Sequence, residues 1–158
     1  TDFAAIGGYD EAMVGWGGED DDLYARLQFA GLRTESFPAS LVGEIKHDDD
    51  ARVRFYAVKN RATQHRINML YLHAKLDLMR LLGETLSAET RHMLFGETQR
   101  AVLAALDAGL TRATLEVRLP ELLIKPPPID GIVEHWQLGR TLAYGIDIQA
   151  RYVERVAA

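Results

Sequence analysis

The residues best suited to chemistry lie together between positions 3 and 27, in the stretch FAAIGGYDEAMVGWGGEDDDLYARL. Trp16 stands among three glycines, and four consecutive carboxylates follow at positions 19–22. Glycine lets the backbone adopt left-handed dihedrals and approach a ligand closely. An indole offers a wide apolar face and one N–H donor, which suits the C–H face of a sugar ring. A carboxylate cluster beside such a platform is a natural place for a general base. The stretch therefore indicates sugar binding with proton transfer.

Helical spacing separates the roles of these carboxylates. Asp20 lies three residues before Leu23, so it is predicted to share the inward-facing stripe of a helix. Asp22 lies four residues before Arg26, and a solvent-side ion pair is the simplest expectation for that pair. Glu19 lies at the mouth of the helix, where its side chain can face a ligand.

The same residues also have a purely structural interpretation. Acidic residues at the start of a helix commonly complement the helix dipole and cap the first turn. A tryptophan beside glycines commonly serves in packing. The order of the features, with an aromatic residue on glycine-rich backbone directly before the acids, favours a functional site.

This stretch resembles the GWGxEDxD signature region of β-1,4-galactosyltransferases and N-acetylgalactosaminyltransferases, which are inverting enzymes of the GT-A fold. The resemblance covers about residues 1–55. It implies an α/β fold, the C-terminal half of a GT-A-like domain, in a fragment of a bacterial family-2-type glycosyltransferase. The matching residues are Phe3, Gly7-Gly8-Tyr9-Asp10-Glu11, Gly15-Trp16-Gly17-Gly18-Glu19-Asp20-Asp21-Asp22 and Leu23.

The resemblance also implies roles for individual residues. Asp20 and Glu19 would be catalytic, Asp20 as the base that takes the acceptor hydroxyl proton and Glu19 as a contact to the donor or acceptor sugar. The remaining implied residues would bind substrate, with Trp16 closing over the sugars; they are Tyr9, Trp16, Gly17, Gly18 and Asp21.

A metal site is implied at His47, which follows the segment 41–46 where the family has a histidine ligand to Mn²⁺. A divalent cation neutralises the charge that develops on a leaving diphosphate. Imidazole and carboxylate ligands suit Mn²⁺ without excluding another divalent ion. Glu44 stands where some relatives place a methionine ligand, and it is either a hard oxygen donor or simply solvated.

The leading hypothesis is transfer of a hexose or N-acetylhexosamine from a UDP-sugar to a hydroxyl of a glycan or glycolipid acceptor, with inversion. The nucleotide-binding half of a GT-A domain is expected upstream, because about fifteen residues precede Trp16. One alternative is a non-catalytic carbohydrate-binding or helical interaction module. A weaker alternative is a metal phosphohydrolase of the His-Asp type built on His47 and Asp48.

Elements that position these residues follow from apolar periodicity and from capping signals. Residues 1–55 are predicted to be the catalytic segment and residues 56–158 a helical extension, with the apolar stripe of its first helix at Ile67, Leu70, Tyr71, Ala74, Leu78 and Leu81. The predicted helices are 19–31, 54–82, 87–108 and 132–156, and the predicted strands are 34–37, 41–46 and 113–119.

Composition excludes several classes of protein. The balance of 18 Lys and Arg against 23 Asp and Glu gives a net charge of −5, which argues against a nucleic-acid partner. With no cysteine, disulfides and thiolate chemistry are excluded. No apolar run reaches the ~18 residues of a membrane span. We expect a cytoplasmic protein, free or peripheral at the inner face of the membrane, and the oligomeric state is left open.

Overall fold

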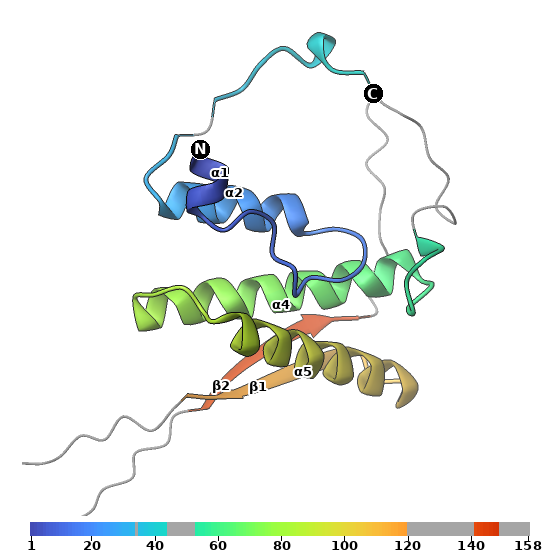
Figure 1. Ribbon diagram of the computed structural model, residues 1–158. Helices are drawn as coiled ribbons and strands as arrows, with labels where there is room; N and C mark the ends of the chain where they lie inside the picture. Colours follow the sequence, from blue (N-terminus) through green and yellow to red (C-terminus); the bar gives the residue numbers. More distant parts are fainter. Residues whose placement is uncertain (34, 44–52, 120–140, 149–158) are drawn as a thin grey trace, which may run out of the picture.

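The computed structural model describes residues 1–33, 35–43, 53–119 and 141–148. A long central helix, α4, has the N-terminal helices on one side and a helix with a small sheet on the other (Figure 1). In chain order the elements are α1 (Asp2–Ala5), α2 (Glu19–Phe29), the 3-10 helix η1 (Ala39–Leu41), α4 (Arg61–Leu82), α5 (Ala88–Asp107), β1 (Arg112–Arg118) and β2 (Thr141–Asp147).

Helix α2 has the predicted position, and α4 ends as predicted but begins later. Gly83 adopts the left-handed conformation (φ 72°) directly after Leu82 and so ends α4. The predicted start at residue 54 is wrong, because Asn60 caps the helix. Its side chain accepts a hydrogen bond from the Thr63 amide at 2.9 Å, which satisfies a donor of the first turn.

Helix α5 confirms the capping prediction at Ser87. The Ser87 hydroxyl oxygen accepts a hydrogen bond from the Thr90 amide at 3.1 Å. The helix ends at Asp107, two residues before Gly109, whose φ is 65°. Strand β1 confirms the strand predicted at 113–119 within one residue at each end.

The helix predicted at 132–156 is wrong over residues 141–147, which form β2. This strand pairs antiparallel with β1, with Leu115 opposite Tyr144. Leu142, Tyr144 and Ile146 pack against the core while the residues between them are exposed. Alternation with period two is the pattern of a half-buried strand, and it outweighs the helical pattern. The rest of the predicted helix lies outside the described residues.

The strands predicted at 34–37 and 41–46 are wrong where the structure describes them. Residues 35–37 form no strand, and Leu41 belongs to η1, which follows Pro38. A strand needs a neighbour to pair its backbone groups, and in the described ranges β1 and β2 pair with each other. Thr34 and residues 44–46 are not among the described residues. The described part combines helices with a small antiparallel sheet; the GT-A-like arrangement and the division at residue 55 stay predictions.

The hydrophobic core lies where α4 packs on α5 and the sheet. Tyr71, Val102 and Ala113 are fully buried, and the rings of Tyr71 and Phe95 meet edge to face at 5.3 Å. The predicted stripe of α4 is confirmed apart from Leu81, which is 45% exposed near the helix end. Within the described ranges, the helices are too short or too polar to cross a membrane.

Candidate functional site

Residues 15–18 form a loop, the Trp loop, that requires glycine for reasons of conformation and space. Gly15, Gly17 and Gly18 have φ values of 110°, 91° and 88°, in the left-handed region that other residues rarely adopt. A Cβ at Gly17 would also lie 2.7 Å from Cδ2 of His65 on α4. The glycines around Trp16 therefore let the chain turn tightly against α4.

Two buried amide side chains of α4 hold the Trp loop by its backbone. Gln64 Oε1 accepts a hydrogen bond from the Trp16 amide at 2.6 Å. Asn68 Nδ2 donates to the Gly17 carbonyl at 2.7 Å. Gln64 is in turn oriented by its own amide group, which donates to the Val58 carbonyl. The loop is thus attached to a rigid helix through two successive residues of its backbone.

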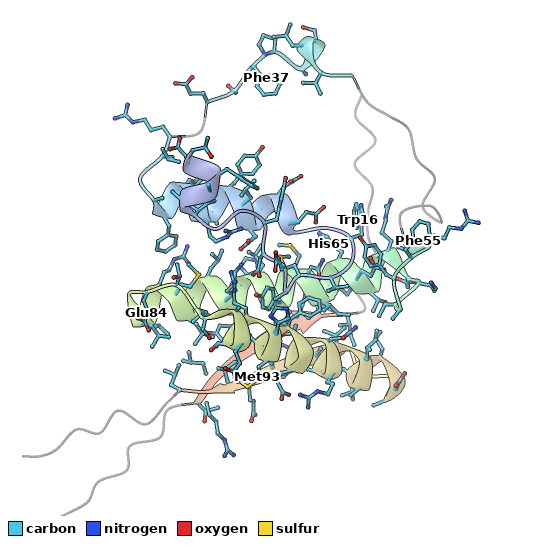
Figure 2. All side chains as sticks on the ribbon, in the orientation of Figure 1. Trp16, Phe37, Phe55, His65, Glu84 and Met93 are labelled. Atoms are coloured by element: carbon cyan, nitrogen blue, oxygen red, sulfur yellow. The ribbon has the colours of Figure 1, made fainter. Side chains whose placement is uncertain are left out.

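The Trp16 indole lies over the N-terminal part of α4, close to His65 (Figure 2). The two rings are 5.7 Å apart and tilted by 42°. The Arg61 guanidinium lies 4.7 Å from the indole centroid, in a cation–π arrangement. The Arg61 guanidinium therefore lies over the ring that the sequence analysis assigns to a sugar.

The four carboxylates of the first turn of α2 differ from the prediction in which of them are buried and which are exposed. Glu19, Asp20 and Asp21 are exposed, whereas Asp22 is fully buried. The predicted inward orientation of Asp20 is thus wrong, and so is the solvent-side position of Asp22. The pair of Asp22 with Arg26 is present, with Arg26 Nε 2.9 Å from Asp22 Oδ2, but it faces the protein interior.

A buried charge cluster explains this rotation of α2. Lys75 on α4 is fully buried, and its Nζ contacts both Asp22 Oδ1 and Asp10 Oδ2, the latter at 2.7 Å. Arg26 also donates to the Ile6 carbonyl at 2.8 Å. Buried charges are tolerated only when they are paired and hydrogen-bonded. The cations on α4 and α2 therefore decide which acid of the motif faces inward.

Asp10 is the second acid of this cluster. It accepts hydrogen bonds from the Tyr71 hydroxyl at 2.6 Å and from the Ala12 amide at 3.1 Å, and Arg91 Nε lies 3.7 Å away. Burial by itself would raise the pKa of Asp10, but the hydrogen bonds from Lys75 and Tyr71 outweigh it and hold that pKa below its ordinary value. Burial, and then the bond to Asp10, raise the pKa of the Tyr71 phenol.

Sequence reasoning missed this cluster, although one signal was available. Lys75 comes directly after Ala74 and four residues after Tyr71, so it falls on the apolar stripe of α4. A lysine is almost never fully buried without a partner. Its position therefore indicated buried carboxylates on a neighbouring segment, without saying which ones.

Of the predicted site residues, Tyr9 and Asp20 are brought together from different segments. The Tyr9 hydroxyl points to Asp20 Oδ1 at 3.4 Å, a long contact at the surface, and the Tyr9 ring meets Phe3 edge-on at 5.7 Å. The negative charge of Asp20 is the main cause that raises the pKa of the Tyr9 phenol. Glu19 and Asp21 are exposed on the same helical turn, next to Gly18, which is the N-cap of α2.

The predicted metal ligand His47 lies outside the described residues, as do Glu44 and Asp48. In the part of the chain that the structure describes, there is no group of three or more His, Asp or Glu side chains placed to hold a metal ion. Asp22 is occupied by its buried ion pairs. A metal centre therefore stays a prediction.

Comparisons with known proteins address the N-terminal part of the chain. Residues 1–74 match the family described as the N-terminal domain of galactosyltransferase. Beta-1,4-galactosyltransferase 5 of Danio rerio is 45% identical over 56 residues, which cover 34% of this chain and 14% of that protein. Beta-1,4-galactosyltransferase 1 of Bos taurus is 42% identical over 53 residues, covering 32% and 13%.

The chain spans about a seventh of the length of these curated relatives. No solved structure matches it significantly. The matched stretch contains the Trp loop, the acidic turn of α2 and most of α4. Residues 1–74 are therefore galactosyltransferase-like.

Proposed function

We propose that this chain carries the acceptor side of a glycosyltransferase active site. The reaction is the transfer of a hexose or N-acetylhexosamine from a UDP-sugar to a hydroxyl of a glycan or glycolipid, with inversion. The observation that carries the proposal is the exposed acidic turn of α2 standing directly after a Trp loop that α4 holds in place. The galactosyltransferase-like match over residues 1–74 supports it.

Asp20 is the general base of this proposal. Its carboxylate is exposed and can approach an acceptor hydroxyl to within the hydrogen-bond reach that proton transfer needs. As the hydroxyl oxygen attacks the sugar carbon, its proton moves to Asp20 and the bond to the diphosphate breaks. Asp22 cannot take this role, because it is buried and paired with Arg26 and Lys75.

The remaining residues of the turn hold the sugars. Trp16 supplies an apolar ring face, and the backbone of Gly17 and Gly18 allows close approach. Glu19 and Asp21 are exposed acceptors for sugar hydroxyl groups. Tyr9 lies beside Asp20 and helps to orient its carboxylate.

A divalent cation, Mn²⁺ or another, belongs to the proposal through His47 and the family resemblance alone. Such an ion would neutralise the leaving diphosphate. The roles of Asp20, Trp16 and Tyr9 do not depend on it.

The test is a UDP-sugar transfer assay on the full-length protein with Asp20→Asn. This change keeps the size of the side chain and removes its basicity, so kcat should fall by roughly 10²-fold or more while the KM of the acceptor changes little. The matched control is Asp107→Asn, an exposed aspartate in the last turn of α5. A kcat for Asp20→Asn equal to that of the control would refute the role of base. Acceptor binding without any transfer by the unmodified protein would favour the carbohydrate-binding module.

A further inference from the structure

Gln64 and Asn68 lie four residues apart on α4 and therefore share one face of the helix. They are 2% and 1% exposed. Their side chains hydrogen-bond to adjacent positions of the Trp loop, the Trp16 amide and the Gly17 carbonyl, at 2.6 and 2.7 Å. Both bonds reach the backbone, so they fix the course of the loop rather than the identity of a side chain.

The Trp loop needs such anchors. Three glycines in a segment of four residues make it costly to order, since glycine loses more conformational freedom on folding than any other residue. No residue of the loop belongs to a helix or strand in the structure. Helix α4, by contrast, is held by the buried core on Tyr71 and Ala74.

We infer that Gln64 and Asn68 are positioning residues that fix the Trp16 indole at the place where a sugar ring stacks. This inference rests on the proposed function. Gln64 sets the direction of the Trp16 peptide, and Asn68 binds the carbonyl of Gly17, which leads into Gly18 and the first turn of α2. The two amides thus set the indole and the acidic turn relative to the same helix.

The first test begins with the unmodified chain. In hydrogen exchange, the Trp16 amide should be protected, because its proton is bonded to a buried oxygen. In Gln64→Ala this protection should fall by about tenfold or more, the worth of one hydrogen bond. Exchange of the Trp16 amide at the rate of an unstructured peptide in the unmodified chain would overturn the anchoring.

The second test follows the indole itself. The chain has two tryptophans, so Trp136→Phe leaves Trp16 as the single tryptophan emitter. In that background Gln64→Ala and Asn68→Ala should each raise the acrylamide quenching of Trp16 while circular dichroism keeps its helical signal. The control is His73→Ala, an exposed position on α4. Quenching unchanged from the control in both variants would overturn the inference.

Activity separates this inference from the proposed function. In the transfer assay Gln64→Ala should raise the acceptor KM by about tenfold with a smaller change in kcat, because a displaced indole weakens sugar binding. An unchanged KM with a mobile indole would overturn the sugar-stacking role. If the unmodified protein transfers no sugar, the proposed function fails, whereas exchange and quenching still decide whether the two amides anchor the loop.

Discussion

Replacing Lys75 by methionine removes a buried cation that contacts two acids of the motif. Methionine has a similar length and shape without the charge, so the change is chiefly electrostatic. In the described part of the protein, Lys75 Nζ lies against Asp22 Oδ1 and 2.7 Å from Asp10 Oδ2. Both carboxylates are buried, with Asp22 fully excluded from solvent and Asp10 only 5% exposed.

The expected cost follows from what remains around each acid. Removing one partner of a buried ion pair costs about 3–5 kcal/mol, because the other charge is left without compensation. Asp22 keeps Arg26, and Asp10 keeps the Tyr71 hydroxyl and the more distant Arg91. We therefore expect a loss near the lower end, about 3 kcal/mol.

Urea unfolding of the full chain at pH 7, followed by circular dichroism, measures this loss. The control is Lys59→Met, an exposed lysine that bonds to the Arg54 carbonyl; it should change the free energy of unfolding by less than about 0.5 kcal/mol. In the double variant Lys75→Met with Asp10→Asn, part of the loss should be recovered, since one uncompensated charge is gone. A loss below about 1 kcal/mol for Lys75→Met, with no recovery in the double variant, would refute the reasoning.

Further outcomes follow from the same structure. Because the pKa of Asp10 is lowered in the folded state, its stabilisation is present above the ordinary value of 3.8 and should be lost as the pH falls through the folded pKa, which acid titration of stability would detect. Gly17→Ala should destabilise the chain by roughly 1–3 kcal/mol, since its φ is 91° and a Cβ would lie 2.7 Å from a ring atom on α4. Gly96→Ala, in open space inside α5, should instead stabilise the chain by about 0.5–1 kcal/mol in the same denaturation assay. Asp20→Asn should lower the pKa of Tyr9 in an ultraviolet titration, and an unchanged value would show that the two side chains do not interact in solution.

The ends of the helices were predictable because their signals are local. Ser87 caps α5 through an amide three residues away, and Gly83 ends α4 in a left-handed conformation. Asn60 is likewise an N-cap residue, and its position in the sequence indicates that α4 starts at residue 61. Such features depend on a few neighbouring residues, so a sequence shows them directly.

The orientation of α2 was not predictable in this way. Its apolar residues, Leu23 and Tyr24, suggested the inward face, yet Leu23 is only half-buried and Tyr24 is 54% exposed. Charges set the rotation of the helix, since Asp22 pairs with Arg26 on α2 and with Lys75, which lies far along the chain. In a short, acidic helix with few apolar residues, such distant partners outweigh the periodicity.

In the proposed function, burial separates the two acids Asp22 and Asp20. Asp22, held by two cations, is a structural residue, and Asp20, two residues earlier, is left at the surface beside Tyr9. On a helix, residues two apart cannot point the same way. Fixing Asp22 inward against α4 therefore turns Asp20 outward, which is the position that the proposed base needs to reach an acceptor hydroxyl. Lys75 and the amides that anchor the Trp loop thus set both halves of the proposed site from one helix.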